Sequence, residues 1–377
     1  MTALIRCNSC LMPKTRPDTE FVGGRCSACI AHSQRDQIDW SARRQDLIKL
    51  IESAKVSPEG YHCIIPSSAG KDSHYQVLTA LEIGAKPLIV TATTCMLTEI
   101  GEANIRNLAR YADTLEVTPN RRVRATLNRL GLELVADASW PEHVAIFHIP
   151  WRVAAEKKIG LILYGECPQN AYGGPMGTLD ARRMTRQWVA EFGGHLGLRP
   201  SDMVGMAGIR REDMAIYQMP SEEQIAGVEA HFLGAYIPWN SHRNANVAVK
   251  AGMTIPAEPP SRANWFCAEN LDNAQTGLHD WSGYTKYGYG RACAQISIDI
   301  RYGLISREEA ITVVREIDGL FPEVYMGVHY KEVLDYIELP EPRFWELARQ
   351  HANKALFDVS GERPVIKPDV WEASFCT

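Results

Sequence analysis

Long apolar segments are absent from this chain of 377 residues. No apolar stretch approaches the roughly 18 residues that a membrane-spanning helix needs, and the start of the chain lacks the long apolar segment of a secretory signal. We therefore expect a cytoplasmic protein with no membrane partner. The net charge is −5 and no long stripe of lysine and arginine is evident, so broad nucleic-acid binding is not expected.

The ten cysteines are unevenly distributed, and four of them lie within the first 29 residues. Cys7 and Cys10 form one Cys-x2-Cys knuckle, and Cys26 and Cys29 form a second one 15 residues later. This spacing lets four thiolates surround one tetrahedral zinc ion, and a site saturated by sulfur is structural because it leaves no position for substrate. Two alternatives stay open: an iron–sulfur cluster on the same sulfurs, and cysteines that hold no metal.

The segment Ser67–Ser73 reads Ser-Ser-Ala-Gly-Lys-Asp-Ser between an apolar run and a helical pattern. A small-residue turn from a strand into a helix points several backbone N–H groups at one spot, where the positive helix end favours a phosphate. Lys71 supplies a cation, Ser68 and Ser73 supply hydroxyl groups, and Asp72 can hold magnesium or orient the lysine. The spacing of a Walker loop is not met. The alternative is an ordinary capped strand–helix turn.

Short apolar runs alternate with helical periodicity between residues 61 and 165, which predicts a parallel sheet covered on both faces. The expected strands are Cys63–Pro66, Pro87–Thr91, Thr114–Val117 and Leu161–Tyr164. The expected helices are Ser73–Ile83, Ile100–Tyr111, Arg121–Arg129 and Pro141–Lys158. Ligands of such sheets bind beyond the carboxyl ends of the strands.

Glu166 follows the fourth expected strand and Cys95 follows the second, so both are expected near the loop. Glu166 is suited to bind magnesium or to relay a proton from an incoming amine, and a merely solvated carboxylate is the alternative. Cys167 beside it is a candidate nucleophile, although no activating base can be named for it.

The pattern changes after residue 200. Ser221–Gln224 and Ser306–Glu309 have capping-box spacing and predict helix starts. Between them lie stretches rich in aromatic residues, glycine and asparagine. Aromatic faces beside lysine and arginine suit a polar, ring-shaped, anionic ligand, and we expect Lys286 and Arg291 to contact it. For the aromatic residues, packing against the sheet is the alternative.

Residues Ser68–Ser73 resemble the PP-loop of ATP pyrophosphatases, enzymes that cleave ATP between the α- and β-phosphates and leave AMP on a substrate oxygen. The family form has a glycine where this chain has Ala69, whose β-carbon excludes a strongly positive φ and so alters the phosphate approach. Over nearly its full length the chain resembles the N-acetyl sugar amidotransferase family, which is associated with acetamidino sugars of bacterial surface polysaccharides. Besides the four cysteines and the loop, the resemblance rests on Tyr164–Glu166, Gly173–Pro175, Arg182–Met184, Glu191–Gly194, Tyr236–Trp239, Glu269–Leu271, Lys286–Arg291 and Ser297–Gly303. Cys167 stands where an asparagine is commoner, and Cys267 lies in a segment that usually lacks cysteine.

The resemblance implies an α/β protein in three parts. A zinc-binding module of four cysteines at residues 1–35 precedes a PP-loop domain of the adenine nucleotide α-hydrolase type at residues 36–200. A mainly helical, substrate-binding region follows at residues 201–377. The implied enzyme is an ATP-dependent amidotransferase that adenylylates the carbonyl of an N-acetylated sugar nucleotide, releases pyrophosphate and replaces the oxygen by ammonia to give an amidine.

The implied cofactors are ATP, Mg2+ and Zn2+. ATP contacts are assigned to Ser68, Ala69, Gly70, Lys71, Asp72, Ser73 and Thr91. Lys71 and Asp72 act in catalysis together with Glu166, and the sugar nucleotide is assigned to Arg182, Lys286 and Arg291. No cysteine lies on a recognisable glutaminase turn, so a separate glutaminase subunit is implied as the partner that supplies ammonia.

A rival interpretation keeps AMP activation and changes the nucleophile to sulfur. Some tRNA thiolases also carry two Cys-x2-Cys knuckles before a PP-loop, and an iron–sulfur cluster or persulfide would then use Cys95, Cys167, Cys267 and Cys293. The acidic net charge argues against tRNA, but a thioamide-forming enzyme acting on a small molecule escapes that objection. A third interpretation, a non-catalytic nucleotide-binding scaffold, is disfavoured by the intact Lys71-Asp72-Ser73.

Overall fold

A computed structural model describes residues 4–179 and 181–375. Its centre is a six-stranded sheet with the order β5-β4-β3-β6-β8-β7, in which β7 pairs antiparallel with β8 and the other pairs are parallel. The strands are β3 (Cys63–Pro66), β4 (Pro87–Ala92), β5 (Thr114–Val117), β6 (Leu161–Tyr164), β7 (Arg183–Met184) and β8 (Glu229–Phe232). The chain is therefore a mixed α/β protein.

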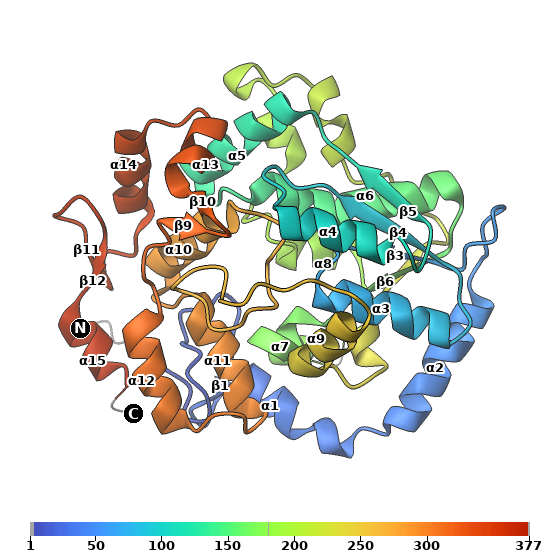
Figure 1. The fold of residues 1–377 in the computed structure, drawn as a ribbon, viewed down its shortest axis with the longest axis horizontal. Helices are drawn as coiled ribbons and strands as arrows, with labels where there is room; N and C mark the ends of the chain where they lie inside the picture. Colours follow the sequence, from blue (N-terminus) through green and yellow to red (C-terminus); the bar gives the residue numbers. More distant parts are fainter. Residues whose placement is uncertain (1–3, 180, 376–377) are drawn as a thin grey trace.

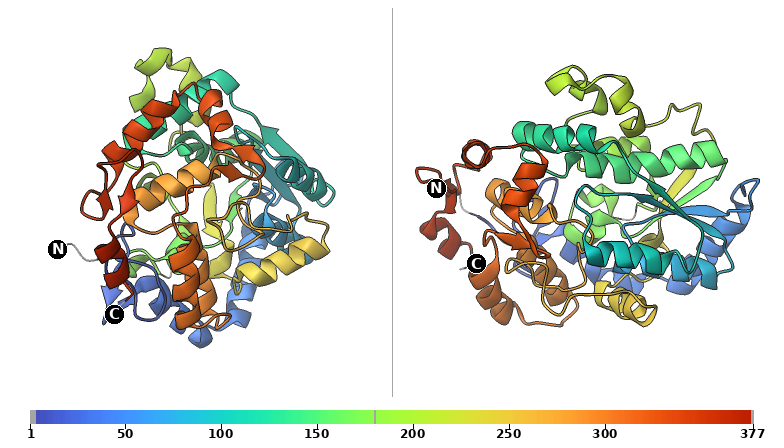
Figure 2. Two further views of the ribbon diagram at one scale, coloured as in Figure 1. Left: turned by 60° about the vertical axis from the view of Figure 1, so that its left-hand side comes forward. Right: turned by 45° about the horizontal axis from the view of Figure 1, so that its top comes forward.

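Helices cover both faces of this sheet (Figures 1 and 2). One face carries α3 (Lys71–Glu82) and α4 (Glu99–Leu108), and α9 (Ser241–Lys250) packs on α3. The opposite face carries α5 (Arg121–Val135) and α6 (Trp140–Lys157). Because both faces are covered, the central strands are continuous apolar runs, and Ile64, Ile89 and Ile162 are buried.

The order of the strands reverses between β3 and β6. From β3 the chain moves outward through β4 to β5, and it then returns across the sheet to β6 on the other side of β3. In open sheets of this kind, the crevice beyond the carboxyl ends at such a reversal is where ligands bind. The segments that follow β3 and β6, Ser67–Gly70 and Gly165–Cys167, therefore meet at the position favoured for a site.

The C-terminal helices form a second body beside the sheet, drawn in orange and red (Figure 1). Its core contains the aromatic side chains of Trp281, Phe344 and Trp345. The helices are α10 (Thr276–Tyr287), α11 (Arg291–Arg301), α12 (Arg307–Ile317), α13 (Tyr330–Tyr336), α14 (Glu341–His351) and α15 (Pro368–Ala373). Two short hairpins join them, formed by β9 (Val324–Tyr325) with β10 (Val328–His329) and by β11 (Phe357–Asp358) with β12 (Val365–Ile366).

The N-terminal segment packs against these C-terminal helices up to residue 33, and its last helix instead contributes Leu47 and Ile51 to the core of the sheet (Figure 1). It contains β1 (Phe21–Val22), β2 (Arg25–Cys26), α1 (Ser27–Ser33), the short 3-10 turn η1 (Arg35–Gln37) and α2 (Trp40–Ser53). The guanidinium of Arg6, which is fully buried, lies over the rings of Trp371 and Phe375 and donates to Ser374 Oγ. Arg6 thereby ties the two ends of the described chain together.

Between β6 and β8 the chain is mostly irregular. It contains α7 (Pro168–Tyr172) and α8 (Arg186–Phe192). The 3-10 turns here and after β8 are η2 (Met176–Thr178), η3 (Pro200–Met203), η4 (Met206–Gly208), η5 (Glu212–Tyr217) and η6 (Leu233–Ala235). α7 packs against α1 of the N-terminal segment.

The four strands and four helices expected between residues 61 and 165 are confirmed, with the largest boundary difference at α5, which continues to Val135. The helix expected at Ser221 is wrong. Ser221 and Gln224 form the reciprocal capping bonds, but only turns follow, and Gly227 has a φ of 80°. The capping box at Ser306 does begin a helix, α12. The central sheet also contains β8, which lies after residue 200, in the region expected to be mainly helical.

Among the described residues, no helix combines the length and the apolar character that a bilayer crossing requires.

Candidate active site at the carboxyl edge of the sheet

The loop Ser67–Gly70 leads from β3 into the first turn of α3. Ser67 Oγ accepts a hydrogen bond of 2.9 Å from the backbone N–H of Ala69, which folds the loop tightly. Gly70 is the N-cap of α3 and, among the described residues, no side chain caps this end. The first-turn N–H groups of α3 are thus left for an anion, which the positive helix end also favours.

Ala69 adopts the left-handed conformation, with a φ of 58°. The β-carbon was expected to exclude a strongly positive φ, and the positive φ that Ala69 adopts is the moderate value of the left-handed helical region. The left-handed region is accessible to an alanine at a cost of about 1 to 2 kcal/mol, and here the residue is 1% exposed and held by Ser67. A positive φ is therefore kept at this position in spite of the methyl group.

Lys71 is buried at the start of α3 and forms two ion pairs. Its Nζ lies 2.7 Å from Asp72 Oδ2 and 3.3 Å from Glu269 Oε1. Although burial opposes the charged ammonium, these two carboxylates raise the pKa of Lys71 above its ordinary value. Burial favours the neutral form of Glu269 as well. The positive charges of Lys71 and Arg291 outweigh this effect, so the pKa of Glu269 lies below its ordinary value. The lysine is therefore a fixed cation within the site.

Glu269 was not assigned a role from the sequence. It comes from the segment between α9 and α10, and Gln295 of α11 donates to its second oxygen over 2.7 Å. Asn244 of α9 likewise donates to Asp72 Oδ1 over 2.8 Å. The only sequence signal for Glu269 was its place in the resembling segment Glu269–Leu271, because a pairing partner 198 residues away leaves no local pattern.

Glu166 lies at the carboxyl end of β6, beside the loop that follows β3. Burial and the negative charge of Asp72 raise the pKa of Glu166 to about 7, against the opposing effect of Lys71. A carboxyl group with this pKa exchanges protons readily near neutral pH. Three carboxylates, those of Asp72, Glu166 and Glu269, therefore surround one lysine, and this excess of negative charge suits a phosphate-bound magnesium ion.

Two cavities flank this group. The loop cavity, about 80 Å³, is lined by Ser68, Lys71 and Ser73 together with Glu269 and Asp272. The Glu166 cavity, about 380 Å³, lies between the sheet edge and the N-terminal segment. Pockets for whole small molecules measure about 300 to 1,000 Å³, so the loop cavity takes part of a ligand and the Glu166 cavity can take a larger one.

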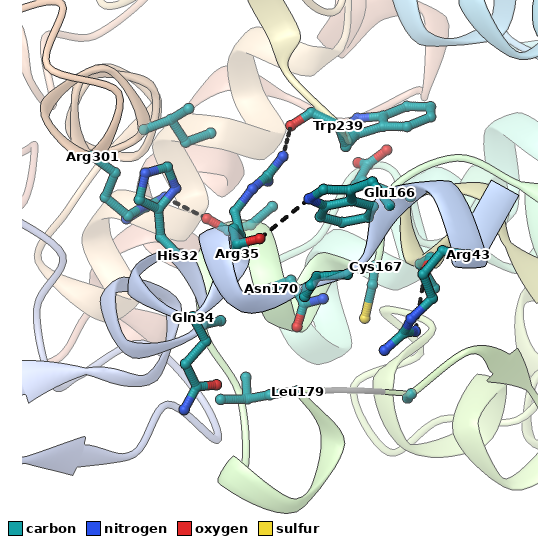
Figure 3. A pocket seen from close by; sticks show the side chains of 18 of the residues that line it. His32, Gln34, Arg35, Arg43, Glu166, Cys167, Asn170, Leu179, Trp239 and Arg301 are labelled. Atoms are coloured by element: carbon teal, nitrogen blue, oxygen red, sulfur yellow. Dashed lines mark hydrogen bonds between the residues drawn. The ribbon is translucent and has the colours of Figure 1, made fainter. Parts of the chain in front are cut away.

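The Glu166 cavity combines aromatic and cationic side chains (Figure 3). Arg35 donates to the carbonyl oxygen of Trp239 over 2.9 Å, and Arg301 donates to the carbonyl oxygen of Ala171. The contact of Arg35 is to a neutral carbonyl, whereas Arg301 also donates to Cys10 Sγ and is partly offset by the cysteine cluster. The cavity is thus suited to an anionic ligand that carries rings.

The other sequence-assigned residues are placed differently. Thr91 is 3% exposed near the end of β4 and lines neither of these cavities. Arg182 pairs with Asp46 on the surface at 3.1 Å, outside both cavities. Lys286 and Arg291 do come together, in a third cavity of about 320 Å³ that we call the Lys286 cavity.

The four N-terminal cysteines converge as predicted. Their sulfur atoms all lie within 4.8 Å of one another, and the Cys7–Cys29 and Cys10–Cys26 Sγ distances are both 3.7 Å. Four Zn–S bonds of about 2.3 Å give sulfur separations of about 3.8 Å in a tetrahedron, so this set fits a single zinc ion. Sulfurs that bind different irons of a cluster lie further apart.

The cysteine cluster supports the loop that carries Glu166. Backbone N–H groups of Ser9 and Met12 point at cysteine sulfurs over 3.4 Å, and Arg301 donates to Cys10 Sγ over 3.6 Å. Ser27, directly after Cys26, accepts a hydrogen bond of 3.0 Å from the N–H of Gly174. The four-cysteine segment therefore anchors Gly174 and packs against α7, which follow Glu166 in the chain.

The remaining thiols named in the sequence are dispersed. Cys95 donates to Gln275 Oε1, Cys293 contacts Arg6 and Leu11, and Cys167 contacts Gln169. Burial raises the pKa of Cys95 well above its ordinary value and that of Cys293 to about 12, and it also raises the pKa of Cys267. These three residues are held as thiols, which disfavours their use as nucleophiles.

Comparison with known proteins links the C-terminal region to polysaccharide synthesis. Residues 261–367 match a family model described as the C-terminal domain of LPS biosynthesis protein WbpG-like proteins. The match spans Glu269, Lys286 and Arg291 and supports a role in polysaccharide biosynthesis. No curated protein shows a significant match to the chain.

Proposed function

We propose that this protein is an ATP-dependent amidotransferase that converts the N-acetyl group of a sugar nucleotide into an acetamidino group. The observation that carries the proposal is the meeting of Lys71, Asp72 and Glu166 at the strand-order reversal, in a chain whose C-terminal region matches a polysaccharide-biosynthesis family. Both substrates are charged, water-soluble nucleotides, which agrees with a cytoplasmic reaction.

In this proposal the loop works as a PP-loop. The first-turn N–H groups of α3, Ser68, Ser73 and Lys71 hold the β- and γ-phosphates in the loop cavity, whose small volume suits phosphate groups alone. Asp72 and Glu166 supply the oxygens for Mg2+, which offsets the charge that develops on the phosphates. The contact between Asn244 and Asp72 fixes the orientation of that carboxylate.

The reaction follows from the chemistry of an amide. The amide oxygen attacks the α-phosphorus, the bond to the β-phosphate oxygen breaks, and pyrophosphate leaves. The resulting AMP ester makes the carbonyl carbon electrophilic. Ammonia then attacks this carbon, AMP departs with the oxygen, and an amidine remains. In this proposal Glu166, whose pKa is raised to about 7, accepts the proton that the attacking nitrogen loses once pyrophosphate has left.

The acceptor is assigned to the Glu166 cavity. The guanidinium groups of Arg35 and Arg301, which line this cavity, suit its diphosphate, and Trp239 offers a face for a ring. Ammonia is assigned to a separate glutaminase subunit, because Cys95, Cys267 and Cys293 are held as thiols by their raised pKa values.

Incubation of the protein with ATP, Mg2+, ammonium and a diacetamido sugar nucleotide tests the proposal. We expect AMP, pyrophosphate and a product in which one oxygen is replaced by NH, all lost in Lys71→Ala and retained in Lys86→Ala, a change at an exposed residue. Absence of AMP with every amide offered would overturn the enzyme assignment. If the protein forms a thioamide with sulfide and no amidine with ammonium, the nucleophile is sulfur rather than nitrogen.

The acceptor site has its own test. Arg35→Gln is expected to raise KM for the sugar nucleotide at least tenfold and to leave KM for ATP within twofold. Arg210→Gln, at an exposed arginine paired with Asp213, serves as the control. An equal rise in both KM values would contradict the assignment of the sugar nucleotide to this cavity.

A further inference from the structure

A second cluster of metal-ligating side chains lies apart from the four cysteines. Asp137 lies between α5 and α6, His143 lies on the first turn of α6, and His279 lies on the first turn of α10. One ligand atom from each lies within 4.8 Å of the others. His279 is 142 residues away from Asp137 along the chain, so only the fold brings them together.

Both imidazole rings direct the same nitrogen at the carboxylate. His279 Nδ1 lies 2.7 Å from Asp137 Oδ1, and His143 Nδ1 lies 3.0 Å from Asp137 Oδ2. The ring centroids are 4.9 Å apart. Tetrahedral coordination with bonds of about 2.0 to 2.1 Å separates ligand atoms by about 3.3 Å, so each nitrogen–oxygen distance needs to lengthen by only about 0.3 to 0.6 Å to admit an ion.

The carboxylate in this cluster is unusual in its charge balance. The Asp137 side chain is 2% exposed, and the ion pairs that it forms are with the two histidines. The backbone N–H of Ser139 also donates to Oδ1 over 2.8 Å. A buried carboxylate requires positive charge nearby. Protonated imidazoles or a bound cation would supply it, in addition to the more distant Lys286.

The surroundings resemble those of an open metal site rather than a closed one. Both histidines and Asp137 line the Lys286 cavity, which measures about 320 Å³ and also contains Arg16, Lys286 and Arg291. His279 Nε2 lies 4.0 Å from Asp280 Oδ1, so an acidic group stands near the second nitrogen, as is common for metal-bound histidines. A divalent ion more than neutralises Asp137, and the positive cavity that results favours an anionic ligand.

We propose that Asp137, His143 and His279 bind a divalent transition-metal ion of the zinc class, with an open coordination position that faces the Lys286 cavity and takes a phosphate or carboxylate oxygen. Two imidazoles and one carboxylate are a donor set that such ions accept, and three protein ligands leave a position free. This site is independent of the amidotransferase proposal.

Metal content after incubation with Zn2+ and removal of loose ions tests the site. We expect two equivalents in the wild-type protein and one in Asp137→Asn, His143→Gln and His279→Gln, each with an unchanged far-UV circular dichroism spectrum. His242→Gln is the matched control, since His242 pairs with Asp299 at 2.7 Å without a third ligand, and it should retain two. A single equivalent in the wild-type protein overturns the proposal, as does a second one retained in all three variants.

Titration of the wild-type protein with Co2+ gives a test that needs no variant. The first equivalent should produce the intense near-ultraviolet charge-transfer bands of thiolate ligation. The second should produce only weaker visible bands, and inorganic phosphate should change these bands and leave the thiolate bands unchanged. A second equivalent without visible bands, or bands that phosphate does not alter, contradicts an open site with nitrogen and oxygen ligands.

Discussion

Lys71 and Glu269 form an ion pair of 3.3 Å, although 198 residues separate them and both side chains are nearly buried. Removal of one partner of a buried pair leaves an uncompensated charge and typically costs about 3 to 5 kcal/mol. The pair therefore contributes both to the site and to the joining of the sheet with the C-terminal helices.

A double-mutant cycle on this pair should show strong coupling. We expect Lys71→Met and Glu269→Gln together to destabilise the protein by at least about 1 kcal/mol less than the sum of the single changes, because each single change leaves the other buried charge less well compensated, with only Asp72 near Lys71 or Arg291 near Glu269. The free energy of unfolding in urea measures this. The exposed pair Arg44–Glu82, at 3.0 Å, is the control and should couple by less than about 1 kcal/mol. Equal coupling in the two cycles would contradict a buried, energetically significant pair.

Ala69→Gly should leave the stability of the protein nearly unchanged. Loss of a buried methyl group and added chain entropy destabilise the variant, but relief of the positive φ of 58° offsets them. Ala80→Gly, at a buried position inside α3, gains no such relief and should cost about 1 kcal/mol or more. The difference in urea midpoint between the two variants is the readout, and equal losses would argue against a left-handed Ala69.

Cys7→Ser should remove the metal of the four-cysteine site and loosen the loop that carries Glu166. Ser27 and Gly174 are joined by a hydrogen bond of 3.0 Å, so a disordered metal segment no longer holds residues 166–174. We expect loss of one zinc equivalent and faster amide exchange in that loop. Cys267→Ser, a change at a half-buried thiol outside the cluster, should alter neither property. An unchanged rate of amide exchange in Cys7→Ser would show that the metal does not stabilise this loop.

Stability should fall as the pH drops from 7 to 5.5 because of two buried histidines. Burial lowers the pKa of His148 and that of His195 to about 4, whereas unfolded histidine has a pKa near 6.5. In this window the unfolded chain binds more protons than the folded one, so acidification favours unfolding by about 1 kcal/mol per histidine. His148→Gln keeps a donor for Tyr217 and should show a smaller loss between the two pH values. An equal loss of stability in the wild-type protein and in His148→Gln would show that other groups cause the pH dependence.

The sequence predicted those parts of the fold that have local causes. β3 and β6 are short apolar runs buried on both faces, and their bounds match the prediction. β8 was missed because Glu229 and His231 interrupt its apolar pattern, while Ala230 and Phe232 are buried. The turn at Ser221 has the right capping residues but lacks a helix, since capping alone supplies too little stabilisation without a packed apolar face.

Only those parts of the site that lie within a short segment of the chain could be predicted from the sequence. The loop Ser67–Ser73 and the knuckles of Cys7 and Cys26 each carry their chemistry within a few residues. Glu269 and the cluster around Asp137 depend on contacts between distant elements, and no spacing in the sequence records such contacts. The Glu166 cavity was missed for the same reason, because Arg35 and Arg301 reach it from opposite ends of the chain.

The contact between Cys10 and Arg301 also sets an order of events during synthesis, since 291 residues separate the two. At about 5 to 20 residues per second, roughly 15 to 60 s pass between their emergence from the ribosome. All four cysteines emerge together at the start of that interval, so they can take up their ion while the helices that later bury them are still unmade. A nascent chain therefore presents four exposed thiols, which zinc would shield from oxidation until α11 is made.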